Sequence, residues 1–253
     1  MTLGHEFSGT VTEVGSGVTH LKKGDQVAVD PNGPCYCCHD CTSGTYHLCQ
    51  IASINDTYGI FKDGGFAPYC KVTANNVHKL PPTVNLELGA LTEPVSCLSH
   101  GIDRLGSPAM GSRFLVLGAG IIGVLWANAL HLLGHRRITV SEPSDARRKL
   151  IAGLGLGIEG VTPQELQQRH EKDRSWGVDV VIDCSGNARA IESALEYLNP
   201  GGKLLIFGVS HPDARINVSP FQIYKKELSI LGVLVNPYSF PKSLGYLESF
   251  GDK

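Results

Sequence analysis

The chain has 253 residues, of which 42% are hydrophobic and 18% are charged, and its formal net charge is −2. This balance argues against a dedicated nucleic-acid binder, which usually presents a basic face. The longest apolar run, residues 114–133, is broken by glycines and contains Asn128 and His131, so no membrane span is expected. We expect a soluble globular protein of one large or two modest domains.

Residues 1–93 show short β-type runs separated by glycine-rich turns. Strands are expected at residues 8–14, 25–29 and 65–72, where β-branched and aromatic residues gather. Pro81-Pro82 marks a linker-like break, and a helical stretch is expected from about residue 86 to residue 103. These patterns predict a first domain over residues 1–93 that is β-rich, either barrel-like or sandwich-like.

A group of four cysteines follows the second expected strand. Cys35, Cys38, Cys41 and Cys49 have the spacing Cys-x2-Cys-x2-Cys-x7-Cys. Four thiolates can enclose one tetrahedral Zn²⁺, and a shell closed by four protein ligands leaves no position for a substrate. The tetrad therefore predicts a structural zinc site that fixes the lobe around it.

Three other interpretations of the tetrad are less favoured. No signal peptide precedes it, so the cytoplasm is the expected compartment, where clustered cysteines more often bind metal than form disulfides. Ferredoxin-type iron–sulfur runs place the fourth cysteine three residues later and before a proline, whereas Gln50 follows Cys49. A two-knuckle nucleic-acid finger needs a long spacer between its cysteine pairs. Cys37, His39 and His47 do not fit the repeat and are interpreted as bystanders.

From residue 113 the chain alternates between strand and helix patterns. Strands are expected at residues 113–117, 137–140, 178–183, 203–207 and 228–233, with a weaker signal at 158–161, and helices at 121–133, 145–154, 188–198 and after Thr162-Pro163. Such alternation predicts a parallel, doubly wound sheet. We expect this α/β arrangement to form a second domain over residues 94–253.

A glycine-rich turn connects the first strand and helix of that region. Gly118, Gly120 and Gly123 form a G-x-G-x-x-G motif that directly follows a buried strand and opens a helix. The first glycine permits the tight turn, the second lets the backbone approach a pyrophosphate, and the third lets the helix pack on the strand. We predict that these glycines and Ile122 bind a dinucleotide at the N-terminus of the helix.

Glu142 is the candidate ligand for the ribose of that dinucleotide. It follows the second strand and lies nineteen residues after Gly123, where the fingerprint places an acid. A carboxylate there would repel a 2′-phosphate, so NAD is favoured over NADP. Arg147 is included among the cofactor-binding candidates because arginine can accommodate the extra phosphate, although Arg147 and Arg148 also fit a solvated helix face.

Several motifs together resemble the zinc-dependent medium-chain dehydrogenase/reductase family, particularly its polyol (sorbitol-like), butanediol and threonine dehydrogenase branches. The motifs are Gly4-His5-Glu6-Phe7-Ser8-Gly9, Gly24-Asp25-Gln26-Val27, the cysteine tetrad, residues 63–67, Glu93-Pro94, residues 116–120, residues 141–144 and residues 178–186. The resemblance implies a Rossmann domain preceded by a GroES-like catalytic domain. It also implies an enzyme that oxidises a secondary alcohol of a polyol-like or small hydroxy substrate.

The resemblance further implies a second, catalytic zinc. His5 would be a ligand, Glu6 a ligand or an outer partner, and Glu93 would take the place of the third protein ligand. Imidazole and carboxylate groups suit Zn²⁺ on their own chemistry. Cys97, four residues after Glu93, could be a substitute ligand, but a buried core thiol is the favoured interpretation.

The chain departs from the family pattern at both ends. The family's first catalytic-zinc ligand is a cysteine well before the Gly-His-Glu motif, and the family continues beyond the motif at residues 236–241. We therefore expect both domains to be incomplete and catalytic competence to be in doubt, the alternative being a non-catalytic form that keeps nucleotide and structural zinc binding. The apolar run at 228–235 could pair two chains, so a homo-oligomer is possible.

Overall fold

The computed structural model describes residues 1–250, which form two compact units. The first unit combines residues 1–100 with the segment that begins at Leu234, and the second unit spans Gly101–Val233. The contacts thus divide the chain differently from the expected ranges 1–93 and 94–253, because the chain after Val233 packs with the first unit. The final three residues of the second expected range lie outside the described residues.

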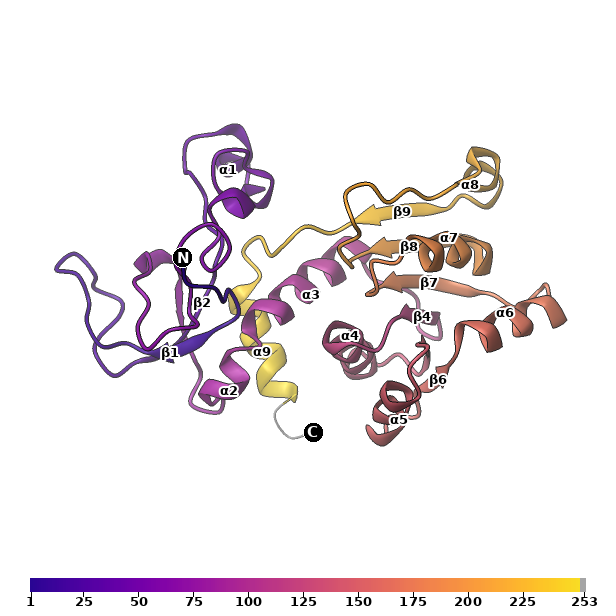
Figure 1. The fold of residues 1–253 in the computed structure, drawn as a ribbon, viewed down its shortest axis with the longest axis horizontal. Helices are drawn as coiled ribbons and strands as arrows, with labels where there is room; N and C mark the ends of the chain where they lie inside the picture. The colour runs from indigo at the N-terminus through magenta and orange to yellow at the C-terminus, as the bar shows by residue number, and fades with distance from the viewer. Residues whose placement is uncertain (251–253) are drawn as a thin grey trace. The chain divides into compact units, whose positions relative to one another are not determined.

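The first unit is built around a small antiparallel sheet in the order β1-β2-β3, and Figure 1 labels β1 and β2 of this sheet. Its elements are β1 (Ser8–Thr10), β2 (Gln26–Val29), α1 (His39–Thr42), η1 (Tyr46–Leu48), η2 (Ser53–Asp56), η3 (Ala74–Asn76), β3 (Val77–Lys79), α2 (Leu86–Gly89), α3 (Thr92–Leu105) and α9 (Phe240–Phe250). Helix α3 continues past His100 into the second unit. The segment between β2 and β3, which includes α1 and η1, carries the cysteine tetrad.

Two expected strands of the first unit differ from the structure. The strand expected at 8–14 is limited to β1, and the strand expected at 65–72 is absent. In place of a regular ladder, the backbone N–H groups of Gly64, Gly65 and Phe66 donate to the carbonyls of Thr2, Gly4 and Leu3 over 2.9–3.0 Å. Residues 64–66 are therefore a loop that holds the start of the chain.

The helical stretch expected at 86–103 is two helices, α2 and α3. Asn85 caps α2, because its side chain accepts a hydrogen bond from the N–H of Leu88 at 2.8 Å. Strand β3 and helix α9 carried no assigned pattern in the sequence. β3 is only three residues long, and it forms because Val27 and Val29 of β2 pair with Lys79 and Val77.

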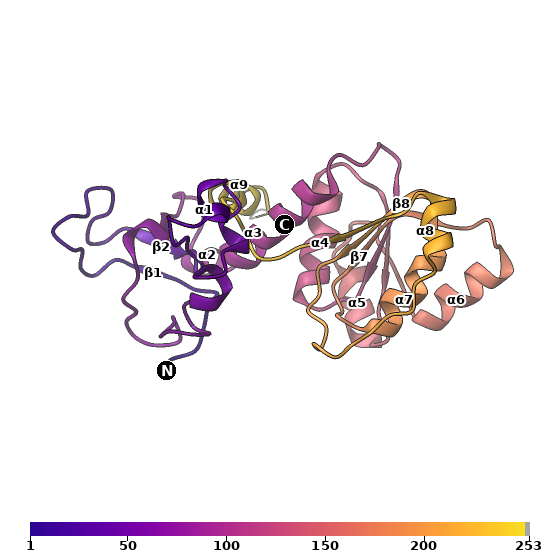
Figure 2. The ribbon, with the colours of Figure 1, turned by 90° about the horizontal axis from the view of Figure 1, so that it is seen from above.

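The second unit is the expected doubly wound parallel sheet, in the order β6-β5-β4-β7-β8-β9. Its elements are β4 (Arg113–Leu117), α4 (Ile121–Leu132), β5 (Arg137–Ser141), α5 (Asp145–Gly153), β6 (Glu159–Val161), α6 (Pro163–Lys172), β7 (Val178–Asp183), α7 (Ala188–Tyr197), β8 (Leu198–Ile206), α8 (Pro220–Lys226) and β9 (Ser229–Gly232). Figure 2 shows α4 and α5 on one side of the strands and α7 and α8 on the other. The Rossmann prediction is confirmed.

The core of the second unit explains why its strands were visible in the sequence. Leu115, Val181 and Leu204 on three neighbouring strands are fully buried, with Trp126 of α4 equally buried. Strands covered on both faces read as continuous apolar runs, so they stand out from the turns between them. The weakly signalled β6 and α6 are also present. Thr162 and Glu165 form a capping box at the N-terminus of α6.

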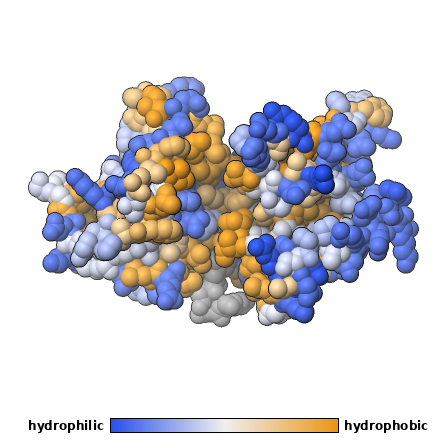
Figure 3. All heavy atoms as spheres, in the orientation of Figure 1, coloured by the Kyte–Doolittle hydropathy of each residue, from blue (hydrophilic) through white to orange (hydrophobic). Residues whose placement is uncertain are grey.

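The surface of α6 is polar, as expected of a helix with a single buried residue, Leu166. Figure 3 shows this region as a hydrophilic surface. The short helix α8 was not predicted, although Ser219 caps it and Pro220 opens it, a common start signal. Within residues 1–250, no helix reaches the length and apolar character needed to cross a membrane.

One contact inside the first unit gives a pH-dependent prediction. The His78 ring of β3 stacks on Phe240 of α9, with ring centroids 5.0 Å apart, and burial lowers the pKa of His78 below its ordinary value of 6.5. Because the unfolded chain takes up a proton at this position before the folded chain does, the His78 contribution to stability is present above pH 6.5. It is lost as the pH falls through the lower folded pKa.

We therefore expect an NMR titration of the His78 ring to show a midpoint below 6.5. Phe240→Ala uncovers the ring and should move the midpoint back toward 6.5, whereas Phe221→Ala, at an exposed position of α8, should leave it unchanged. An unchanged midpoint in Phe240→Ala would show that this contact does not set the pKa.

Candidate metal and cofactor sites

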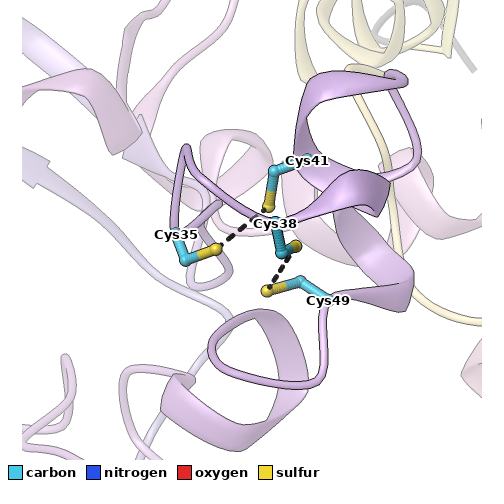
Figure 4. A group of neighbouring side chains, drawn as sticks. All are labelled: Cys35, Cys38, Cys41 and Cys49. Atoms are coloured by element: carbon cyan, nitrogen blue, oxygen red, sulfur yellow. Dashed lines mark hydrogen bonds between the residues drawn. The ribbon is translucent and has the colours of Figure 1, made fainter.

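The cysteine tetrad forms one compact group of thiols. Cys38 is the N-cap of α1 and Cys41 lies inside that helix, while Cys35 precedes it and Cys49 follows η1. The four sulfur atoms lie within 4.8 Å of one another, and the Sγ–Sγ distances Cys35–Cys41 and Cys38–Cys49 are both 3.6 Å. Figure 4 shows all four side chains pointing to a common centre.

These distances fit a zinc ion with four sulfur ligands. A tetrahedron with Zn–S bonds near 2.3 Å has edges of about 3.8 Å, close to the two observed separations. The N–H groups of Cys37 and Cys38 lower the pKa of Cys35, whereas burial raises the pKa of Cys41, so a bound cation is needed to hold all four groups as thiolates. Cys37 Sγ lies 3.6 Å from Cys35 Sγ but is exposed and outside the tetrad.

His5, Glu6 and Glu93 form a second group that could hold a metal. Their ligand atoms lie within 4.8 Å of one another, and His5 Nε2 is 4.0 Å from Glu6 Oε1. His5 and Glu6 come from the segment before β1, and Glu93 from the first turn of α3. The structure therefore brings together the three residues proposed from the family resemblance, all within the first unit.

Glycines set the path of the segment that carries His5. Gly4 has a φ of 102°, a conformation that favours glycine, and Gly65 N–H donates to its carbonyl at 2.9 Å. A Cβ on Gly59 or Gly64 would collide with the Gly4 backbone. The loop at 59–66 thus fits closely around Gly4 and fixes the residue that precedes His5.

The electrostatics of this group favour a cation. Glu93 is only 6% exposed, and burial together with the nearby Glu6 carboxylate raises the pKa of Glu93 to about 8. Its neighbour Cys97 donates to Glu93 Oε1 at 3.5 Å, and burial raises the pKa of that thiol. A bound divalent ion would stabilise the two carboxylates, and the imidazole and carboxylate groups fit Zn²⁺. Cys97 thus contacts a candidate ligand and lies outside the candidate metal group.

The glycine-rich turn has the geometry of a dinucleotide-binding turn. Gly118 has a φ of 98°, and its N–H donates to the Ser141 carbonyl at 2.8 Å. A Cβ on Gly123 would collide with the Gly118 carbonyl, whereas a Cβ on Gly120 would meet no atom within 4 Å. The third glycine is needed for packing, and the second leaves the N-terminus of α4 open to a ligand.

A cavity of about 530 Å³ lies beside this turn in the second unit. It is lined by Gly118, Gly120, Glu142 and Arg147 among the predicted cofactor residues. Strands β4 and β7 are neighbours that begin the two halves of the sheet, so the turn after β4 lies at the topological switch point. Ile122 and Gly123 are not among the lining residues.

The cavity also contains residues that the sequence analysis did not identify. They are Leu117, Ser141, Pro143, Pro163, Gln164, Leu166, Gln167, Cys184, Ser185, Asn187, Arg189, Ala190, Ser193 and Tyr197. One signal was available, because Ser185 and Asn187 directly follow β7, and ligands of such sheets bind beyond the carboxyl ends of the strands. The contribution of α6 and α7 depends on tertiary packing.

The Glu142 side chain is held by the backbone around it. It is 4% exposed, and its two oxygens accept hydrogen bonds from the N–H groups of Ala119 at 2.8 Å and Ser144 at 2.9 Å. Arg147 lies 3.8 Å away, with its side chain 59% exposed. Glu142 thus holds the glycine-rich turn against the end of β5 and places a carboxylate on the cavity wall.

Comparisons with known proteins agree with this architecture. Residues 1–82 match the alcohol dehydrogenase GroES-like domain, and residues 120–249 match the zinc-binding dehydrogenase family. D-altritol 5-dehydrogenase of Agrobacterium fabrum is 36% identical over 98% of the chain and 72% of its own length.

Two solved structures extend these comparisons. A protein of Sinorhizobium meliloti described as a zinc-binding dehydrogenase, bound to NADP, is 32% identical, with a TM-score of 0.91 over 99% of this chain and 73% of its own. An alcohol dehydrogenase of Escherichia coli complexed with NADH is 26% identical, with a TM-score of 0.86 over 98% of this chain and 72% of its own.

The chain belongs to the zinc-dependent medium-chain dehydrogenase family, and it is an oxidoreductase. The predicted GroES-like and Rossmann domains are confirmed. The comparisons support the expected class of alcohol or polyol oxidoreductase with a nicotinamide cofactor. They do not bear out the expectation that catalytic competence is in doubt, and they lend no support to the non-catalytic alternative.

The tetrad gives a direct prediction of metal content. Cys41→Ser replaces a buried thiolate of the closed group, so this variant should lose one equivalent of zinc per chain and unfold the lobe around residues 35–49. The matched control is Cys37→Ser, which alters an exposed thiol of the same loop and should retain its zinc. Mass spectrometry would measure the zinc content of both variants, and limited proteolysis would measure the folding of the lobe. Equal zinc content and equal protease sensitivity in the two variants would contradict the assignment.

Proposed function

We propose that this chain is a zinc-dependent dehydrogenase that oxidises a secondary alcohol of a polyol-like substrate with NAD. The observation that carries the proposal is the His5–Glu6–Glu93 group, in which a buried carboxylate lies beside a second carboxylate and an imidazole. The polyol substrate of the Agrobacterium relative supports the substrate class. Zinc bound at this group would polarise the alcohol oxygen and lower its pKa, which assists loss of the hydroxyl proton.

The protein side chains supply the environment for that chemistry. His5 and Glu93 would hold the ion from two different elements, with Glu6 as a further ligand or as an outer partner. Because Glu93 is buried, its carboxylate is poorly screened by water, and its interaction with a cation is strong. His5 and Glu6 have partly exposed side chains, so this part of the group can be reached by a small molecule.

The function is tested by steady-state formation of reduced nicotinamide with added Zn²⁺ and a panel of D-altritol, D-arabinitol, sorbitol, 2,3-butanediol and L-threonine. We expect turnover with at least one polyol, and a loss of roughly 100-fold or more in Glu93→Gln, since even outer partners of metal ligands change activity by about 10–100-fold. Glu87→Gln, an exposed acid on α2, is the matched control and should retain activity.

Two results would contradict the proposed function. The first is the absence of turnover with every alcohol of the panel when both NAD and NADP are tried. The second is equal activity of Glu93→Gln and the wild-type chain, because a metal ligand cannot be dispensable.

We propose NAD rather than NADP as the preferred cofactor because the buried Glu142 carboxylate lies on the cavity wall. A 2′-phosphate beside it would meet like charge, whereas ribose hydroxyls can donate hydrogen bonds to it. Arg147 and Arg189 in the same cavity favour the opposite choice, as does the NADP-bound relative. We expect the effect of Glu142 on cofactor choice to exceed that of Arg147, because Glu142 is buried and the Arg147 side chain is largely exposed.

Binding constants for the two cofactors test this choice. Both tryptophans, Trp126 and Trp176, belong to the second unit, so their fluorescence can report cofactor binding there. We expect NAD to bind at least about tenfold more tightly, which is ~1.4 kcal/mol. Arg147→Ala should weaken NADP more than NAD, and Arg174→Ala, at an exposed position outside the cavity, should change neither. Tighter binding of NADP would overturn the choice.

We further propose that the protein works in the cytoplasm. We also propose that two copies of the chain associate through β9. This strand lies at the edge of the six-stranded sheet, and Ile230 on it is 38% exposed. An edge strand presents backbone groups that can pair with another chain, which supports this homo-oligomer.

A further inference from the structure

A cluster of buried polar side chains lies at the end of β2. Asp30, Asn32, Tyr46 and Asn236, here called the Asp30 cluster, are each at most 7% exposed. Asp30 Oδ1 accepts from Asn32 N–H at 3.0 Å and from Asn236 Nδ2 at 3.2 Å, and Oδ2 accepts from the Tyr46 hydroxyl at 3.0 Å. All three donors are neutral, so the negative charge of an ionised Asp30 is not cancelled within the cluster.

The cluster joins the cysteine-tetrad lobe to the segment that returns to the first unit. Tyr46 packs with Cys41 and Cys49 in the small apolar core of the lobe. Its hydroxyl also reaches the Asn236 carbonyl at 3.2 Å, and its ring meets that of Tyr238 edge-on, with centroids 4.9 Å apart. The lobe therefore fixes the position of Tyr46, and the Tyr46 hydroxyl contacts both Asp30 and Asn236.

Two structural connections lead from the cluster to the His5–Glu6–Glu93 group. In the first, the β1–β2 register pairs Ser8 with Ala28, and Val29 N–H continues it by donating to Phe7 O at 3.4 Å. Glu6 and Asp30 are the residues that follow Phe7 and Val29 outward along these two segments. In the second, Ser239 donates to the Ser96 carbonyl at 2.8 Å, one turn after Glu93 on α3.

Asp30 also acts on the group electrostatically. An ionised Asp30 carboxylate repels the Glu93 carboxylate. The same negative charge that disfavours an ionised Glu93 would favour a divalent cation bound next to it. The negative charges of Glu6, Glu93 and Asp30 would thus all attract a cation bound at the His5–Glu6–Glu93 group.

We propose that Asp30 is a positioning residue for the His5–Glu6–Glu93 metal site, and that Tyr46 and Asn236 couple this site to the cysteine-tetrad lobe. The inference rests on the proposed function, since it requires a metal at the second group. In this arrangement the tetrad does more than stabilise its own lobe. It holds the Tyr46 hydroxyl where Asp30 needs a donor, so that the Asp30 carboxylate stays fixed where its charge acts on Glu93.

The test measures metal binding by the full-length chain, using Zn²⁺ titrated against a competing chelating dye. Co²⁺ distinguishes the two sites, because sulfur-to-metal charge-transfer absorption arises only where thiolates bind the ion. Asp30→Asn removes the charge with little change in shape, and Tyr46→Phe removes only the hydroxyl. The matched control is Tyr58→Phe, since the Tyr58 hydroxyl is similarly engaged with Thr73 at 3.0 Å but lies outside the cluster.

We expect Asp30→Asn and Tyr46→Phe each to weaken the second, thiolate-free site by about tenfold, as removal of outer partners of metal ligands commonly does. The tetrad should keep its full equivalent of metal in both variants. In the double variant, the fold loss of metal affinity at the second site should be smaller than the product of the two single-variant losses. The reason is that both residues act through the Asp30 carboxylate. Tyr58→Phe should bind both metals like the wild-type chain.

Unchanged affinity of the second site in Asp30→Asn or Tyr46→Phe overturns the inference, as does an equal loss in Tyr58→Phe. If Asp30→Asn does not fold, Tyr46→Phe decides the question alone. A wild-type chain that binds one metal only would contradict the proposed function and this inference with it. Two metals in the wild-type chain with unaffected variants would contradict the inference alone.

Discussion

The burial of the Glu93 carboxylate is the constraint on which the candidate metal site depends. The side chains that act on it most directly are the acids Glu6 and Asp30 and the thiol Cys97, and burial raises its pKa to about 8. A carboxylate in such surroundings is stable when it is protonated or when a cation neutralises it. The His5 imidazole beside it indicates neutralisation by a cation, because imidazole and carboxylates together make a site for Zn²⁺.

Several parts of the first unit bring His5, Glu6 and Glu93 together. Glycines at 4, 59 and 64 let two loops approach closely, and β1 begins two residues after Glu6. On the other side, α3 carries Glu93 in its first turn, and Ser239 bonds to that helix through the Ser96 carbonyl. The cysteine tetrad supplies the rigid neighbour from which Tyr46 reaches Asp30. The second unit contributes a separate element, the candidate nucleotide cavity at the carboxyl end of β4.

Prediction from sequence agreed best with the structure where the arrangement of residues depends on their immediate neighbours. The tetrad, the Gly118–Gly123 turn and the strands β4, β5 and β7 are each defined by local spacing or by continuous apolar runs. The strand expected at residues 65–72 was wrong, because Gly64, Gly65 and Phe66 bond to residues 2–4 far away in the sequence. Pairing partners of that kind leave no periodic pattern in either segment.

The candidate sites show the same division. His5 and Glu93 could be named only through a family resemblance, since 88 positions in the numbering separate them and neither has a distinctive local context. Asp30 and Asn236 gave no signal, because an isolated polar residue after a strand usually belongs to a solvated turn. Their importance arises from burial together and from the hydrogen bonds that connect three separate segments, at residues 30–32, 46 and 236. Likewise, Arg189 and Tyr197 line the candidate nucleotide cavity only because α7 packs beside β7 and β8.

The most direct test of a metal site at Glu93 is X-ray diffraction at the zinc absorption edge, from crystals of the full chain grown with zinc. We predict two anomalous peaks per chain. One should lie among the sulfur atoms of Cys35, Cys38, Cys41 and Cys49, and the other should be bound by His5 Nε2 and a Glu93 oxygen. A single peak at the tetrad, or a second peak remote from Glu93, would contradict this account.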